Sequence, residues 1–270
     1  MPGIETAILD LGLLDRLARQ DTAVHRLDPR AKVLATLAFV VAVVSFGRYE
    51  VGRLLPFALY PVALMAAGNV PLRFLARKLL VVAPFALLVG AFNPLLDREV
   101  LFHLGPLAVS GGAASFCSIV LRFVLTAGAA LVLVAVTGFN GVCLGLLKLG
   151  APRAFVMQLL FLYRYLFVLV EEAARMGRAR ALRSFGGRGT GLAAFAPLVG
   201  QLLLRTLDRA QRIHQAMLCR GFSGEIRLLS SLNFGRRELA FIGLWGAYFA
   251  LARWLDIPAW LGRIVTGGVL

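Results

Sequence analysis

The sequence predicts an all-α integral membrane protein with about five membrane-spanning helices and a large cytoplasmic helical region. Of its 270 residues, 59% are hydrophobic and only 16% are charged, and the mean hydropathy is +0.80. Because a soluble domain has about 45–50% apolar and about 25% charged residues, one core could not bury this much apolar surface. The composition also excludes a disordered chain and a disulfide-stapled miniprotein.

The charge balance is strongly basic, with 29 Lys and Arg against 14 Asp and Glu and a formal net charge of +15. In a soluble protein this excess would suggest nucleic acid. In a membrane protein it is explained by cytoplasmic loops rich in Lys and Arg and by anionic lipid headgroups. We therefore expect a lipid bilayer, and no nucleic acid, around this chain.

Five apolar stretches are long enough to cross a bilayer, since a spanning helix needs about 20 mostly apolar residues. They are residues 31–48, 53–69, 79–96, 116–138 and 238–256. Between the third and the fourth, residues 101–112 alternate apolar residues around Gly105-Pro106, which predicts a short hairpin.

The arginine distribution orients these spans. A sixth apolar stretch, residues 155–170, would place the arginine-rich segment 171–237 outside the cell if it crossed the membrane, against the positive-inside rule. We therefore expect it either to dip into the interface or to pack under the other helices, and Arg164 between two tyrosines suits an interfacial position. The N-terminus is then cytoplasmic, and the chain divides into residues 1–138, a cytoplasmic region 139–237, and 238–270.

The cytoplasmic region is expected to form three amphipathic helices. The first is short, with Asn140 as its cap and residues 150–152 (Gly-Ala-Pro) at its end. The second runs from about Arg153 to Arg183 and carries Glu171 and Arg175 at i,i+4 spacing.

The third helix begins near Gly191 and ends at Arg220, and Gly221 is the expected left-handed cap. Apolar residues and one histidine share a face of it at helical spacing. They are Leu203, Leu207, Ala210, His214 and Met217. We expect this face to pack against other helices.

The ends of the second and third helices are alike. Residues 182–187 (Leu-Arg-Ser-Phe-Gly-Gly) match 219–224 (Cys-Arg-Gly-Phe-Ser-Gly), each with an Arg at the expected last helical position. One interpretation is two ordinary helix ends, where Arg complements the helix dipole and Gly caps. The other is a pair of anchors, because a guanidinium on a rigid helix end suits a carboxylate or a carbonyl-lined groove.

Several sequence blocks, in this order, resemble a known family. They are residues 25–32 (His-Arg-Leu-Asp-Pro-Arg-Ala-Lys), 105–107, 163–165, 171–172, 178–185 (Arg-Ala-Arg-Ala-Leu-Arg-Ser-Phe) and 215–222 (Gln-Ala-Met-Leu-Cys-Arg-Gly-Phe). Over nearly its whole length the chain resembles the transmembrane T component of energy-coupling factor (ECF) transporters, in the cobalt/nickel (CbiQ-like) branch. The block at 215–222 is the most specific.

The resemblance implies a mechanism. Two cytoplasmic ATPase subunits bind beneath the T component, whose two coupling helices cross in an X. Each coupling helix ends in an Ala-Arg-Gly-type motif, and the motif arginine enters a groove on one ATPase. ATP-driven closure of the ATPase pair moves these helices. That motion acts on a separate substrate-binding membrane (S) subunit, which a small accessory membrane subunit is expected to accompany.

The residues of the two family motifs are assigned to this sequence by position. Arg220 with Gly221 matches the second motif, and Arg183 with Ser184 stands at the first, where Ser replaces Gly. Arg180 is the alternative at the first motif. For Leu203, Leu207 and Met217 we expect coupling-helix packing.

The chain lacks the motifs of an enzyme. It contains no G-x-x-x-x-G-K-[ST] loop, so ATP and Mg²⁺ are expected on the partner ATPase. His25, His103 and His214 are scattered, which predicts no metal site and no cofactor on this chain. Arg122, in the fourth span, is either a functional intramembrane charge or a side chain that snorkels to the outer interface.

We therefore predict a non-catalytic subunit of an ATP-driven importer in the bacterial inner membrane, with cobalt as the expected substrate, for cobalamin biosynthesis. Nickel or a vitamin is the alternative, because the resemblance places selectivity in the partner. A self-sufficient permease is a further alternative, although it requires polar residues converging within the spans, where the sequence has few.

Overall fold

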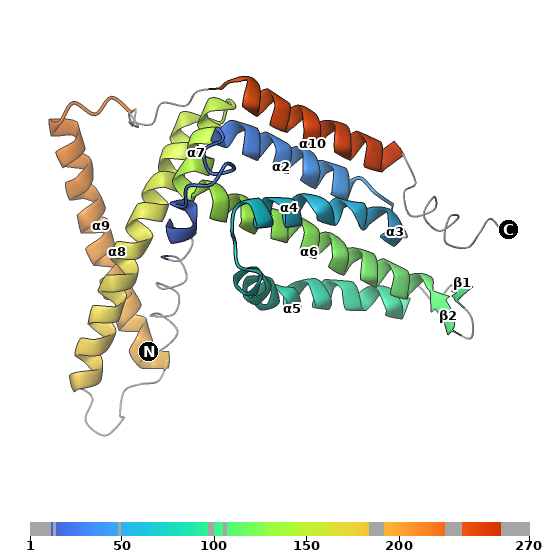
Figure 1. The fold of residues 1–270 in the computed structure, drawn as a ribbon. Helices are drawn as coiled ribbons and strands as arrows, with labels where there is room; N and C mark the ends of the chain where they lie inside the picture. Colours follow the sequence, from blue (N-terminus) through green and yellow to red (C-terminus); the bar gives the residue numbers. More distant parts are fainter. Residues whose placement is uncertain are drawn as a thin grey trace. The chain divides into compact units, whose positions relative to one another are not determined.

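The computed structural model describes residues 12, 15–47, 50–96, 100–104, 107–183, 192–224 and 234–254. The chain forms two compact units (Figure 1). The bundle unit comprises residues 16–145 and 232–270, and the long-helix unit comprises residues 1–15 and 146–231. Of the first motif, Ser184 lies outside the described residues.

The bundle unit is built around one long central helix, α6 (Gly111–Thr137), which contacts four other helices. These neighbours are α2 (Pro29–Val44), α3 (Val51–Leu54), α4 (Leu59–Ala67) and α5 (Leu72–Leu96). The last helix, α10 (Arg236–Trp254), packs on α2 (Figure 1). α7 (Phe139–Lys148) follows α6 directly and carries the chain from the bundle unit into the long-helix unit.

Two of the five expected spans meet the length and composition of a membrane helix, in α5 (Leu72–Phe92) and α6 (Ala114–Thr137). α10 is one helix over nearly the expected range. The helix is shorter than the expected span 31–48, since α2 ends at Val44 and the chain turns at Ser45 and Phe46.

The expected span 53–69 is interrupted. α3 is followed by a 3₁₀ turn, η1 (Pro56–Ala58), and then by α4. Pro56 cannot donate a backbone hydrogen bond and fixes its own φ, which favours a new helical start at this point. The Tyr248 hydroxyl donates to the Pro56 carbonyl oxygen (2.7 Å), so α10 supports the interruption.

The expected hairpin is confirmed at the backbone. β1 (Val100–Leu104) pairs antiparallel with β2 (Leu107–Ser110), with Leu104 opposite Leu107. The other elements of the described residues are helical, in keeping with the prediction of an all-α fold with one short hairpin between its third and fourth spans.

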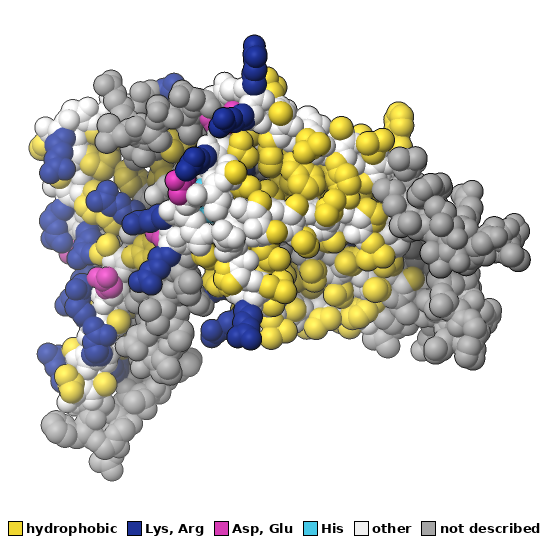
Figure 2. All heavy atoms as spheres, in the orientation of Figure 1, with side chains coloured by type: hydrophobic (Ala, Val, Ile, Leu, Met, Phe, Trp, Pro, Cys, Tyr) yellow, Lys and Arg dark blue, Asp and Glu magenta, His cyan; other side chains and the backbone are white. Residues whose placement is uncertain are grey.

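An aromatic core holds α2, η1, α4 and α10 together. Phe39 and Tyr60 stack with ring centroids 4.8 Å apart, and Phe57 and Phe249 stack at 6.0 Å. The Tyr60 hydroxyl meets the Thr36 hydroxyl at 2.7 Å, so its polar end is satisfied. The outer surface is apolar instead: α5 exposes Leu80, Val81, Phe85 and Leu88, as a lipid-facing helix does (Figure 2).

The long-helix unit consists mainly of α8 (Arg153–Arg183) and α9 (Leu192–Cys219), which contact each other. α8 has the predicted bounds, and α9 ends within one residue of them. Lys and Arg side chains are spread along these two helices (Figure 2). α8 is also long and apolar enough to cross a membrane, whereas the arginine distribution predicts an interfacial position for its first half.

The short helix α7 begins one residue before the expected cap. Phe139 is its first residue, so Asn140 lies inside the first turn, and the chain enters the helix through Gly138 at φ +73°. The predicted end is confirmed. Gly150 has φ +101°, and the amide N–H of Ala151 donates to the Leu146 carbonyl oxygen (3.0 Å), as in a Schellman cap.

Candidate functional site

The C-terminal end of α9 presents Arg220 on a rigid turn. Gly221 has φ +77°, its N–H donates to the Leu218 carbonyl oxygen (3.0 Å), and the Phe222 N–H donates to the Met217 carbonyl oxygen (3.0 Å). This Schellman motif confirms the expected glycine cap. The helix ends at Cys219, so Arg220 is the first residue beyond it rather than the last helical one. Its side chain is exposed.

The C-terminal end of α8 presents the other predicted arginines. Arg183 is the last residue of the helix and is exposed, whereas Arg180 is half-buried. Both line a crevice of about 560 Å³ between α8 and α9, which we call the arginine crevice. It is lined by Glu172, Arg175, Met176, Ala179, Arg180, Arg183, Pro197, Leu198, Gln201 and Arg205.

One carboxylate organises the arginine crevice. Glu172 accepts a hydrogen bond from Arg175 Nη2 (2.6 Å) and another from Arg205 Nη1 of α9 (2.6 Å). The predicted pair between Glu171 and Arg175 is therefore wrong, since Arg175 turns to the neighbouring carboxylate. The hydrogen bonds from Arg175 and Arg205 lower the pKa of Glu172 below its usual range.

The arginine crevice is cationic. Four of its lining residues are arginines, and Glu172 is its single carboxylate, already shared by two of them. Arg180 and Arg183 therefore face no carboxylate within this lining. Guanidinium groups held in this way suit planar, two-point recognition of carboxylates or of backbone carbonyls.

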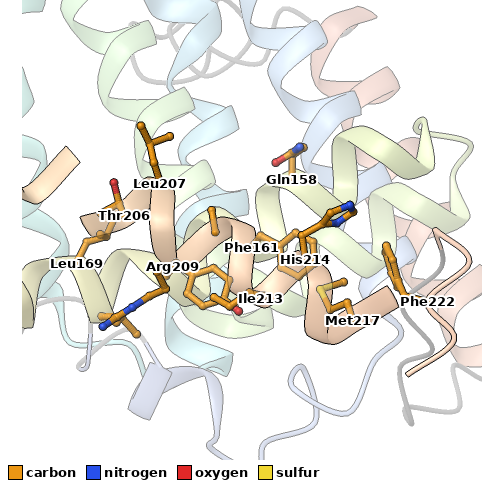
Figure 3. A pocket seen from close by; sticks show the side chains of 13 residues that line it. Gln158, Phe161, Leu169, Thr206, Leu207, Arg209, Ile213, His214, Met217 and Phe222 are labelled. Carbon is orange, nitrogen blue, oxygen red and sulfur yellow. The ribbon is translucent and has the colours of Figure 1, made fainter. Parts of the chain in front are cut away.

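A second recess between α8 and α9 is mainly apolar (Figure 3). It has a volume of about 430 Å³, and Phe161, Tyr165, Val168 and Leu169 of α8 line it together with residues of α9. Of the predicted packing residues, Leu207 and Met217 line this recess and Leu203 does not. Leu203 and Leu207 remain 58% and 52% exposed, so much of this face is left without cover within the described chain.

His214 also lies in this apolar recess. Among the residues described, no group of three or more His, Cys, Asp or Glu side chains could hold a metal ion. His25, in the bundle unit, is held by the Thr22 hydroxyl at Nδ1 (2.8 Å) and donates from Nε2 to the Leu17 carbonyl oxygen (3.0 Å). His103 lies on β1, where only the backbone is described.

Two contacts of the long-helix unit were not predicted. One is the ion pair between Glu172 and Arg205, and the other is the hydrogen bond from the Tyr163 hydroxyl to Asp15 Oδ1 (2.8 Å). Each joins residues far apart in the sequence. The adjacent acidic residues Glu171 and Glu172 were a visible signal, but helical spacing does not reveal a partner on another helix.

Comparison with known proteins matches the chain to one family. The family model described as "Cobalt transport protein" (CbiQ) matches residues 20–230. A cobalt transport protein CbiQ of Rhodobacter capsulatus is 30% identical over 83% of this chain and 89% of its own length. The energy-coupling factor transporter transmembrane proteins EcfT of Heliobacterium modesticaldum and Bacillus subtilis are 26% and 25% identical, over 87% and 80% of this chain and 94% and 87% of their own lengths.

Proposed function

Since the chain belongs to the CbiQ family of ECF transmembrane T components, which are non-catalytic transporter subunits, we propose that it transmits ATP-driven motion. The motion comes from two cytoplasmic ABC-type ATPase subunits and acts on a substrate-binding membrane subunit. One observation carries the proposal: α8 ends in Arg183, the turn that closes α9 carries Arg220, and both side chains are exposed. ATP and Mg²⁺ then belong to the ATPases.

The docking role of the arginines has physical support. Arg220 stands on a Schellman turn that fixes the backbone beside it, and Arg183 projects from the last turn of a 31-residue helix. Preorganised donors of this kind lose little conformational entropy when they bind. Truncating one partner of a buried, hydrogen-bonded charge pair costs about 2–5 kcal/mol. Two such anchors could therefore hold the ATPase pair.

The proposed topology has five spans and a cytoplasmic N-terminus in the inner membrane. In the bundle unit the start of α2 lies beside the end of α6, because Lys32 Nζ is 3.5 Å from the Val136 carbonyl oxygen. The Glu238 carboxylate, at the start of α10, accepts a hydrogen bond from the Asp28 backbone N–H. These three helix ends belong on one side in a five-span arrangement, and the arginine distribution makes that side cytoplasmic.

The proposed substrate is a cobalt ion, carried for cobalamin biosynthesis. The family description and the Rhodobacter capsulatus relative support cobalt, whereas the EcfT relatives are named without a substrate. Nickel or a vitamin is the second candidate. In either case the substrate site belongs to the S subunit.

The test is co-purification of the tagged chain with the ATPase subunits encoded beside it. Wild type is expected to retain the ATPases, and the variant Arg183→Ala with Arg220→Ala is expected to lose them. The control is Arg178→Ala with Arg212→Ala, which removes the same charge from exposed positions on the same two helices. ATPases that remain with the docking variant, or that never bind wild type, would sink the proposal and favour a self-sufficient permease.

Single variants decide which arginine of the first motif docks on the ATPase. If Arg183 is the anchor, Arg183→Ala weakens ATPase binding more than Arg180→Ala, which stands one turn earlier. The reverse order would assign the first anchor to Arg180.

A further inference from the structure

Three charged residues are buried where helix ends meet in the bundle unit. Asp28, Lys32 and Glu238 are 4%, 2% and 8% exposed, and we call them the joint cluster. Charges in such places are costly and need partners. Two of their contacts join segments far apart in the sequence, Lys32 with the Val136 carbonyl and Glu238 with the Asp28 backbone N–H, so the cluster ties those segments together.

Lys32 connects α2 to the end of α6. Its Nζ lies 3.5 Å from the carbonyl oxygen of Val136, in the last turn of α6, and 3.4 Å from that of His25. An ammonium group at a helix C-terminus complements both the free carbonyls and the helix dipole. Coulombic attraction to Asp28 offsets part of the cost of burying the Lys32 ammonium group.

Asp28 and Glu238 connect α2 to the start of α10. Asp28 caps α2 by accepting a hydrogen bond from the Arg30 backbone N–H (2.9 Å). Glu238 caps α10 by accepting one from the Gly235 N–H (2.9 Å) and a further one from the Asp28 N–H. Two helix starts thus share one set of capping interactions.

α7 is packed against this same place through glycines. A Cβ on Gly145 would lie 3.3 Å from the backbone C and O of Pro29 and 3.3 Å from Val33 Cγ2. A Cβ on Gly141 would lie 3.0 Å from Thr137 Cγ2. α7 therefore contacts the first turns of α2 at backbone distance, and a bulky side chain at residue 145 would push it away.

We propose that the joint cluster and the glycine face of α7 form a rigid joint that makes α7 move as one body with α2, α6 and α10. The chain leaves the bundle unit between Gly145 and Leu146, within the last turn of α7. A flexible turn at Gly138, at φ +73°, would absorb motion arriving along α7, whereas a rigid joint passes it to the membrane helices. This inference rests on the proposed function and makes Lys32 and Gly145 positioning residues for coupling.

The test uses the complete transporter in proteoliposomes, with uptake of radioactive cobalt and ATP hydrolysis measured on the same preparation. Lys32→Met removes the buried charge and keeps an unbranched side chain of similar length. Gly145→Leu separates α7 from α2. We expect both to assemble with the ATPases and hydrolyse ATP at the wild-type rate, while uptake per ATP falls about fivefold or more, as a lost coupling free energy of ordinary size predicts.

The matched control is Gly243→Leu in α10, because no heavy atom lies within 4 Å of a Cβ at that position. It should leave uptake per ATP unchanged. The proposal is overturned if uptake by the Lys32 and Gly145 variants falls only in proportion to the amount of complex recovered, which is the behaviour of a merely structural position. Wild type that assembles and hydrolyses ATP but takes up no cobalt would instead contradict cobalt as the substrate, and wild type that does not assemble with the ATPases would contradict the proposed function.

A cross-link tests whether α7 must separate from α2 during transport. In a background with Cys117, Cys143 and Cys219 replaced by Ser, Val33→Cys and Gly145→Cys put one cysteine on each side of the close contact between these two residues. A rigid joint predicts the same uptake per ATP before and after oxidation. Uptake that stops on oxidation and returns on reduction would show that α7 must separate from α2, and would overturn the proposal.

Discussion

Glu172 of α8 accepts a hydrogen bond from Arg205 of α9, with Oε1 and Nη1 2.6 Å apart. The glutamate side chain is only 14% exposed and the arginine side chain is 53% exposed. Ion pairs this open to solvent add little to stability. We therefore infer that this ion pair fixes the position of α9 relative to α8, near the helix end that carries Arg180 and Arg183.

Replacing Glu172 by Gln should loosen the two helices without unfolding them. The variant keeps the shape of the side chain but leaves the arginines of the crevice without a counter-charge, so they repel one another. We expect a broader distribution of distances between spin labels on α8 and α9, measured by pulsed EPR. The control is Glu171→Gln, whose side chain is exposed on the same helix. Equal broadening in both variants would contradict the assignment.

Arg122 supports the segment that follows α2. Its Nη2 donates to the carbonyl oxygen of Phe46 (3.0 Å) and also to that of Gly47. Hydrogen bonds to charged groups contribute about 1.5–3 kcal/mol, so Arg122→Met should lower the melting temperature in detergent. Arg122→Lys, which keeps the charge but not the planar fork, should lower it less.

The same variants distinguish a structural role of Arg122 from a role in transport. If Arg122 acts only on the segment that follows α2, uptake per mole of folded transporter stays at the wild-type level in Arg122→Met. Lost uptake with an unchanged melting temperature would instead make Arg122 a functional intramembrane charge.

Acid should weaken the N-terminal end of the bundle unit through His25. Burial lowers the pKa of His25 below its usual 6.5, and the nearby Lys32 charge lowers it further, while the Leu17 carbonyl and Asp21 oppose the shift. The unfolded state therefore binds the proton first, and stability falls as pH drops through about 6.5 toward the lower folded-state pKa. The stability that depends on neutral His25 is fully present above that pH range.

The check is the melting temperature at pH 7.5 and pH 5.5. The melting temperature of wild type should fall more on acidification than that of His25→Gln, whose side chain does not titrate. Equal losses would show that other groups control the response.

The long helices could be predicted closely from sequence because their ends carry local signals. Pro152 precedes α8 directly, and Gly221 follows the end of α9 by two residues, at the positive φ that glycine favours. The interruption of the second span was missed because a proline is tolerated in a membrane helix, as Pro84 is within α5. Pro56 instead begins a 3₁₀ turn.

The long-range contacts of the candidate site and of the joint cluster followed no local rule. Arg205 lies 33 residues from Glu172, and Lys32 lies 104 residues from Val136. Such pairs depend on which helices become neighbours, and periodicity along one helix does not determine that. The resemblance identified Arg183 and Arg220 as docking candidates, but it did not reveal the carboxylate that positions the crevice beside Arg183.

The turn at Gly221 should control ATPase binding through its backbone. An L-residue at φ +77° is strained by about 1 kcal/mol or more, so Gly221→Ala should shift the Schellman turn and displace Arg220 while leaving that arginine in the sequence. We expect recovered ATPase to fall in co-purification, and Gly221→Asn to restore part of it because Asn tolerates this conformation.

Gly150→Ala is the matched control, since Gly150 has φ +101° at the end of α7 and, like Gly221, would have no heavy atom within 4 Å of an added Cβ. The Gly150→Ala variant carries comparable backbone strain at a place far in the sequence from Arg220. It should therefore lose stability but still bind the ATPase. ATPase lost to the same extent from both alanine variants would mean that general destabilisation, and not the position of Arg220, explains the result.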